Sequence, residues 1–120
     1  RHYVGAMAWS ADGKHLAHTG LDGTRVRVLD PATGAERAKL DTPTAALAFS
    51  PDGGLLAAAG AGGKGNAEGL VELWDAATWR KAASVVGHAG QVNAVAFGPE
   101  GKTLVSGSMD GVLNLWDVRR

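Results

Sequence analysis

The sequence contains no cysteine, and this absence excludes several kinds of chemistry. Without thiols the chain can form no disulfide, no thiolate metal site and no cysteine nucleophile. Lack of cysteine does not identify the compartment, because secreted chains can also lack it. The compartment therefore stays open, with the cytoplasm favoured.

Net charge is also absent, since twelve Lys and Arg residues balance twelve Asp and Glu residues. The long-range attraction that steers basic proteins to nucleic acid or to anionic membranes is missing, so neither partner is predicted. No apolar stretch approaches the length of about eighteen residues that a membrane-spanning helix needs. The first residues show neither a signal sequence nor a start methionine, so we expect the chain to belong to something longer.

What the chain does contain predicts a folded core. Apolar residues make up 45% of the 120 positions and charged residues only 20%, a balance that argues against disorder. The 18 glycines lie mostly beside Asp, Pro or Asn, as turn residues do. The richness in Ala and Gly suggests a bacterial source.

One sequence pattern occurs three times, as "VGAMAWSADGKHLAHTGLDG" from Val4, "TAALAFSPDGGLLAAAG" from Thr44 and "VNAVAFGPEGKTLVSGSMDG" from Val92. Each copy has an aromatic residue, a leucine seven positions later and a closing aspartate. In chain order these are Trp9, Phe49 and Phe97, then Leu16, Leu56 and Leu104, then Asp30, Asp75 and Asp117. A repeated unit of this length indicates a repeat architecture.

Within each copy the apolar pattern has a period of two, which predicts short strands. In "VNAVAF", Val92 is expected on the face of Ala94 and Ala96, opposite Phe97. The segments "SADGK", "SPDGG" and "GPEGK" hold the Gly and Pro of tight turns and so predict hairpins. Four strands per copy and no helix make an all-β fold.

The four strands, the spacing of about 45 residues and the "WD" closure resemble the WD-repeat β-propeller family. The resemblance covers the whole chain. It implies three consecutive four-stranded antiparallel blades at residues 1–40, 41–85 and 86–120, the last lacking its outer strand. The first blade is degenerate, the second carries an inserted loop at 60–67, and the third is preserved best.

The resemblance also implies a buried hydrogen-bonded set in the third copy, the polar quartet of His88, Ser106, Asp110 and Trp116. Paired burial satisfies polar groups that would each cost about 1–3 kcal/mol unpaired. Ser106, His88 and Asp110 are also the residue types of a hydrolase triad. Catalysis would need an exposed serine on a sharp turn, whereas Ser106 is predicted in mid-strand, so a structural role is favoured.

The other two copies have lost most of this set. In the first copy His18 replaces the serine and Leu29 the tryptophan. In the second, Ala58 replaces the serine and Glu68 the aspartate, and only Trp74 remains. The quartet is therefore not the general source of stability, and most burial must come from apolar residues.

Three further motifs have simpler explanations. "GAGGKG", residues 60–65, formally matches a dinucleotide fingerprint, but a strand follows it where phosphate binding needs a helix. A solvent-exposed loop or a partner-contact loop is expected instead. His15 and His18 are three positions apart on a predicted strand, which places them on opposite faces and argues against a shared metal. Arg25 and Arg27 are expected on a solvated face or at a blade edge.

Trp79 corresponds to Gly34 of the first copy, a turn position. A tryptophan there either packs over its own hairpin or is exposed as an anchor for a partner. Both alternatives remain open, and Trp79 is included among the candidate contact residues.

The resemblance implies a non-catalytic scaffold that binds proteins or peptides. A sensor propeller joined to an enzymatic module outside this segment is the alternative, and a hydrolase the least favoured one. No cofactor or metal is predicted. Three blades cannot close a ring, so further blades of a parent chain or self-association are expected to cover both ends. The remaining contact candidates are Tyr3, Leu21, Lys64, Asn66, Gln91 and Met109.

Overall fold

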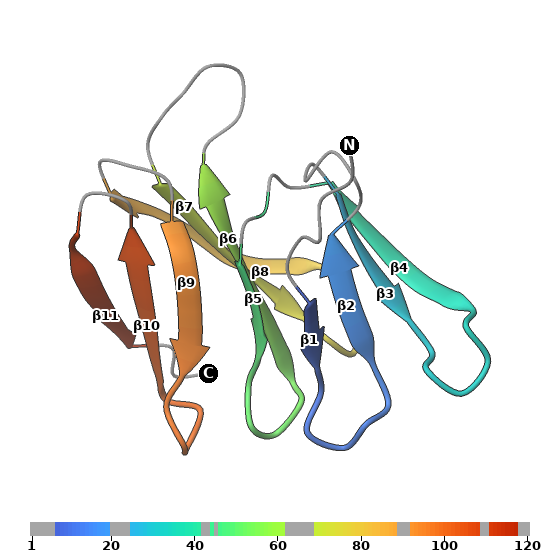
Figure 1. Ribbon diagram of the computed structural model, residues 1–120. Coiled ribbons are helices and arrows are strands. Elements are labelled where there is room, and N and C mark those ends of the chain that lie inside the picture. Colours follow the sequence, from blue (N-terminus) through green and yellow to red (C-terminus); the bar gives the residue numbers. More distant parts are fainter. Residues whose placement is uncertain are drawn as a thin grey trace.

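The computed structural model describes residues 7–19, 25–41, 44, 46–61, 69–88, 92–108 and 111–117. For residues 25, 41, 61, 69 and 85–88 it describes the backbone alone. All regular structure in these ranges is β, in eleven strands that form three antiparallel sheets (Figure 1).

Each sheet is a meander in which consecutive strands are neighbours. The first sheet holds β1 (Met7–Trp9), β2 (Leu16–Thr19), β3 (Arg25–Leu29) and β4 (Glu36–Asp41). The second holds β5 (Ala46–Phe49), β6 (Leu55–Ala61), β7 (Gly69–Asp75) and β8 (Lys81–His88). The third holds β9 (Val92–Phe97), β10 (Thr103–Ser108) and β11 (Leu113–Asp117).

This architecture confirms the predicted all-β fold of three successive antiparallel sheets, the last with three strands among the described residues. One boundary was wrong. Gly60 and Ala61 do not belong to an inserted loop, because they continue β6 and pair with Leu70 and Gly69 of β7. Small residues do not interrupt the ladder of backbone hydrogen bonds. The predicted blade boundaries at residues 40 and 85 stay predictions. In the structure β4 ends at Asp41 and β8 ends at His88.

The strand registers bear out the equivalence of the three copies. The repeated leucine lies opposite the closing aromatic or its replacement: Leu16 opposite Leu29, Leu56 opposite Trp74, and Leu104 opposite Trp116. Two positions further along the second strand of each sheet, the pairs are His18 with Arg27, Ala58 with Glu72 and Ser106 with Asn114. Corresponding residues can therefore be compared between sheets position by position.

The sheets stack face to face, and each of the two contacts between them holds one apolar cluster. Between the first and second sheets lie Ala17, Val26, Val28, Leu40, Leu47, Leu56 and Ala58. Between the second and third lie Ala46, Ala57, Ala59, Val71, Leu73, Val92 and Leu104. In both contacts one sheet presents aromatic rings and the other small or branched aliphatic side chains. Alternation along each strand thus gives every sheet two different faces.

Val92 departs from the predicted alternation. It is fully buried in the same cluster as Val95 and Phe97, whereas Ala94 and Ala96 are exposed. The register between β9 and β10 shifts at this point, so that one residue of β9, Asn93, has no opposite position on β10. An extra residue in one strand is a β-bulge, and it reverses the face that the preceding residue occupies.

The outer faces of the stack are open. On the first sheet Ala8 packs toward the second sheet, so its neighbours Met7 and Trp9 point away and are 57% and 58% exposed. On the third sheet Trp116 packs inward, and Leu113 and Leu115 on the opposite face are 73% and 74% exposed. Figure 1 shows the three sheets side by side, with these faces at the two ends.

Candidate functional site

The polar quartet contains one hydrogen bond that the structure describes. Ser106 lies in the middle of β10 with no exposed surface, and its Oγ accepts a bond from Trp116 Nε1 at 2.8 Å. The ring of Trp116 packs against the cluster between the second and third sheets. The bond joins β10 to β11 while the ring fills the space toward the second sheet.

The other two members of the quartet cannot be placed beside this pair. His88 is the last residue of β8, but its side chain lies outside the described structure, as does Asp110 entirely. The full quartet therefore stays a prediction. Burial of Ser106 argues against the hydrolase alternative, because a nucleophile must be accessible to substrate.

The second sheet has a different polar arrangement at the same positions. Glu72 of β7 faces Ala58, its side chain is only 8% exposed, and its Oε2 lies 3.0 Å from Lys81 Nζ. The same ammonium group lies 5.8 Å from the centre of the Trp74 ring, within reach of a cation–π interaction. The sequence did not single out Glu72; its spacing of two residues from Trp74 could have shown that it shares the buried face.

His15 contributes a contact between the first two sheets that the sequence did not predict. It lies in the β1–β2 turn rather than on a strand, its ring is stacked 6.2 Å from Phe49, and it meets the edge of Trp79 at 5.3 Å. Its Nδ1 is buried without a partner among the described residues. His15 and the half-buried Trp79 thus join the two sheets at the end where these turns lie.

This contact also bears on the two alternatives for Trp79. The ring packs against a residue of the neighbouring sheet, a contact that neither alternative included, and both alternatives stay predictions. Trp79 has a φ of +58°, close to the +77° of Gly34 at the corresponding turn position. A left-handed conformation costs a non-glycine residue about 1–2 kcal/mol, which burial of the indole ring must offset.

Electrostatics favour a neutral His15. Burial of the ring, followed by the positive charges of Arg37 and Lys14, lowers its pKa below the ordinary value of about 6.5, while Asp12 and Asp30 act in the opposite direction. On the same turn the pKa of Asp12 is lowered, because its carboxylate accepts hydrogen bonds from the Ser10 hydroxyl and the Lys14 backbone N–H.

Six of the seven candidate contact residues lie outside the described structure: Tyr3, Leu21, Lys64, Asn66, Gln91 and Met109. Only Trp79 is described. The strands β2, β6 and β10 all end at one edge of the stack, and β9 begins there (Figure 1). Each of the six candidates follows or precedes, in the sequence, a strand that ends or begins on that side.

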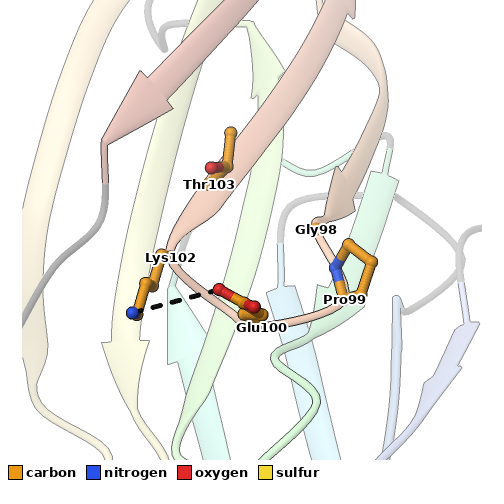
Figure 2. Close-up of a pocket in the computed structure, with 5 residues that line it drawn as sticks. All are labelled: Gly98, Pro99, Glu100, Lys102 and Thr103. Carbon is orange, nitrogen blue, oxygen red and sulfur yellow. Dashed lines mark ion pairs between the residues drawn. The ribbon is translucent and has the colours of Figure 1, made fainter.

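A pocket of about 260 Å³ is present at the opposite edge. Figure 2 shows it lined by five residues of the β9–β10 turn and the start of β10: Gly98, Pro99, Glu100, Lys102 and Thr103. The exposed side chains of Glu100 and Lys102 point toward each other across it, 3.9 Å apart. A single hairpin with one weak surface ion pair does not make a specific site.

Among the described residues no three His, Asp or Glu side chains are grouped so that they could hold a metal ion. His15 and His18 are directed to different surroundings, since His18 Nδ1 lies 3.1 Å from the Thr19 carbonyl oxygen and His15 packs on Phe49. The described part of the chain also contains no helix able to cross a membrane.

Three stacked meanders with matching registers define a segment of β-propeller type. Residues 79–117 match the family described as WD domain, G-beta repeat. The fold is similar to the crystal structure of RRP9 WD40 repeats, with a TM-score of 0.85 over 98% of this chain and 36% of that one, at 17% identity. This chain belongs to the WD-repeat family, and the recognition made from the three copies is confirmed.

Two relatives from Arabidopsis thaliana match almost the whole chain. The WD repeat-containing protein VIP3 is 34% identical over 98% of this chain and 40% of its own length. Pre-mRNA-processing factor 19 homolog 2 is 31% identical over 98% of this chain and 22% of its own length. The chain thus spans less than half of these relatives. They are eukaryotic and do not support the predicted bacterial source.

Proposed function

We propose that the chain is a non-catalytic protein-interaction scaffold within a larger WD-repeat propeller. The observation that carries this proposal is the pair of open outer faces, where Trp9, Leu113 and Leu115 are exposed at positions whose equivalents pack inside the stack. Proteins of this family are generally non-enzymatic, and the burial of Ser106 supports the same conclusion here. The partner is a protein or peptide rather than nucleic acid or a membrane.

Further sheets of the same kind cover the two open faces. Leu113 and Leu115 of the third sheet occupy the positions of Val71 and Leu73, which receive the third sheet on the face of the second. Trp9 occupies the position at which Phe49 of the next sheet packs inward. Exposed apolar side chains gathered on one face are typical of an interface. Such sheets come from the parent chain or from another copy.

The partner-binding surface is the edge at which β2, β6 and β10 end. The candidate residues Leu21, Lys64, Asn66 and Met109 follow these strands in the sequence, and Tyr3 and Gln91 precede strands that begin at this edge. Trp79 lies in the β7–β8 turn at the opposite edge, against His15, and is a separate contact candidate. Turns on a rigid sheet scaffold are where binding residues concentrate, because their sequences can vary without disturbing the core. The turns thus bind the partner, while the packed faces of the sheets stabilise the fold.

Variants that introduce a negative charge at the two edges of the stack test this function. Lys64→Glu and Met109→Glu change the proposed surface, whereas Lys14→Glu and Lys102→Glu are matched controls on turns at the other edge. Proteins cross-linked to the purified full-length protein are identified by mass spectrometry, and its melting temperature is recorded. We expect the first two variants to lose cross-linked partners at an unchanged melting temperature. Equal loss in the controls, or no loss in any variant, would reject the proposed surface.

A further inference from the structure

The second sheet lacks an oxygen atom at a position where the third sheet has one. Ser106 faces Asn114 in the third sheet, and Ala58 faces Glu72 at the matching point of the second. The tryptophan is in register in both sheets, because Trp116 lies opposite Leu104 as Trp74 lies opposite Leu56. The indole N–H of Trp116 donates to a serine hydroxyl, whereas the residue at the matching position of the second sheet, Ala58, carries only a methyl group.

Two buried polar atoms next to Ala58 are left without partners. Trp74 Nε1 and Glu72 Oε1 are both fully buried, and neither has a hydrogen-bond partner among the described residues. The other carboxylate oxygen of Glu72 is held by Lys81 at 3.0 Å, so the side chain is fixed at one oxygen and open at the other. One atom is a donor only and the other an acceptor only, and each carries a free energy penalty unless it is paired.

The third sheet shows how much space is available. There the serine oxygen lies 2.8 Å from the indole nitrogen within the same strand register. In the second sheet the side chain at this position ends at the Cβ of Ala58, so it is one oxygen atom shorter than the serine of the third sheet. A water molecule has this size, and it can accept a bond from an N–H while it donates to a carboxylate.

We propose that one buried water molecule binds between the first and second sheets, in place of the missing serine hydroxyl. Its oxygen accepts the hydrogen bond from Trp74 Nε1, and one of its hydrogens is donated to Glu72 Oε1. Lys81 is a positioning residue, since its ammonium group holds the carboxylate from the other side and lies over the Trp74 ring. The indole N–H of Trp74 in the second sheet thus donates to a bound water, whereas the indole N–H of Trp116 in the third sheet donates to a serine side chain.

Nuclear magnetic resonance of the full-length protein labelled with ¹⁵N in its tryptophan indoles tests this site. We expect a cross-peak between the Trp74 indole N–H and a slowly exchanging water, with the resonance assigned through Trp74→Phe. The Ala58→Ser variant supplies its own hydroxyl and should lose the cross-peak. Ala57→Ser is the matched control, because it places a hydroxyl one residue away on the opposite face of β6, in a site that is equally buried. This variant should keep the cross-peak.

Absence of a water cross-peak at Trp74 in the unmutated protein would overturn the proposal. Persistence of this cross-peak in the Ala58→Ser variant would overturn it as well. If the Ala58→Ser variant does not fold, a high-resolution crystal structure of the unmutated protein tests whether a water occupies the site. A water within hydrogen-bonding distance of both Trp74 Nε1 and Glu72 Oε1 supports the site. A direct bond between these two atoms, or a dry contact, refutes it.

Discussion

At the scale of single residues, a comparison of Ser106 in β10 with Ala58 in β6 shows how one hydroxyl changes a buried contact. Ser106 and Trp116 form a bond in the third sheet, whereas Ala58 leaves Trp74 without a side-chain acceptor in the second. Both sheets retain the same register in spite of this difference. The hydrogen bond therefore adds stability to a contact whose geometry the apolar side chains already determine.

The Ser106→Ala variant should lower the free energy of unfolding by about 1–3 kcal/mol, because it removes the buried hydroxyl that accepts the hydrogen bond of the Trp116 indole N–H. Urea denaturation of the full-length protein measures the effect. Ser84→Ala, at an exposed position of β8, is the control and should change stability by less than about 0.5 kcal/mol. If both variants lose the same amount, the hydrogen bond contributes nothing specific.

At the scale of elements, the turns between the first and second strands of each sheet differ in a systematic way. In the first two turns a serine hydroxyl, Ser10 or Ser50, donates to the aspartate two residues later at 2.6 Å and accepts a backbone N–H at 3.0 Å. The third turn has Gly98 and Glu100 at these positions, so it lacks the serine hydroxyl. All three turns keep a glycine with a φ of +74°.

Replacing Gly98 by Ser together with Glu100 by Asp should give the third turn the hydrogen bonds of the other two. A Cβ at Gly98 meets only Thr103 atoms at 3.6 Å, which is ordinary contact, so the serine fits. We expect the free energy of unfolding to rise by about 1 kcal/mol, as measured by chemical denaturation. Glu100→Asp alone provides no hydroxyl and should gain less. An equal gain would show that the carboxylate position, not the serine, matters.

The contact between the first two sheets should weaken in acid. The folded state lowers the pKa of His15, so below pH of about 6.5 the unfolded chain takes up a proton that the folded ring resists. The free energy of unfolding should therefore fall as the pH drops below 6.5 and level off once the pH passes the lowered folded value. Above that window the residue makes no pH-dependent contribution.

Melting temperatures of the parent protein and His15→Phe between pH 8 and pH 5 measure this effect. Phenylalanine keeps a ring against Phe49 and Trp79 but cannot be protonated, so the variant should lose less stability on acidification. Parallel curves for the two proteins would mean that His15 does not titrate differently in the folded state. Carboxylates elsewhere affect both proteins alike, so the difference between the curves isolates the ring.

Sequence periodicity predicted these elements well wherever the interactions are local. The hairpin turns and the registers set by Leu16, Leu56 and Leu104 follow from patterns within one copy. The bond between Ser106 and Trp116 was implied by the resemblance to the WD-repeat family. Contacts between sheets were harder to predict from the sequence. The bulge at Asn93 reverses Val92 without any signal in the strand itself.

His15 and Trp79 show the same difficulty, because they are 64 positions apart in the chain and meet only when two sheets stack. Neither residue is marked by the repeat pattern. Glu72 was missed because the residue opposite the serine position differs in every copy, with Arg27 in the first and Asn114 in the third. Local periodicity therefore predicts strands and turns, while the pairing of sheets decides these side-chain contacts.

At the scale of the whole molecule, the exposed leucines of the third sheet report on what covers it. Leu115→Lys changes a side chain that is 74% exposed in the three-sheet stack. If another sheet covers this face in the full-length protein, as we propose, the buried ammonium group should lower the free energy of unfolding by about 1–3 kcal/mol.

Thermal or chemical denaturation of the full-length protein measures this loss, and Ala82→Lys on the exposed surface of β8 is the control. If Leu115→Lys is as stable as the control, the face is open to solvent in the full-length protein. This result would contradict the proposed propeller.

The unlike faces of each sheet have a consequence for how the gene can change. Because aromatic rings on one side meet small aliphatic side chains on the next at both contacts, the stack has a direction, and a duplicated unit could enter at either junction without exposing a mismatched surface. Growth or shortening by whole units would preserve every existing contact except at the point of change. The number of units in such a protein can thus change over evolution within the range that lets the ring close, while the order of the two faces cannot.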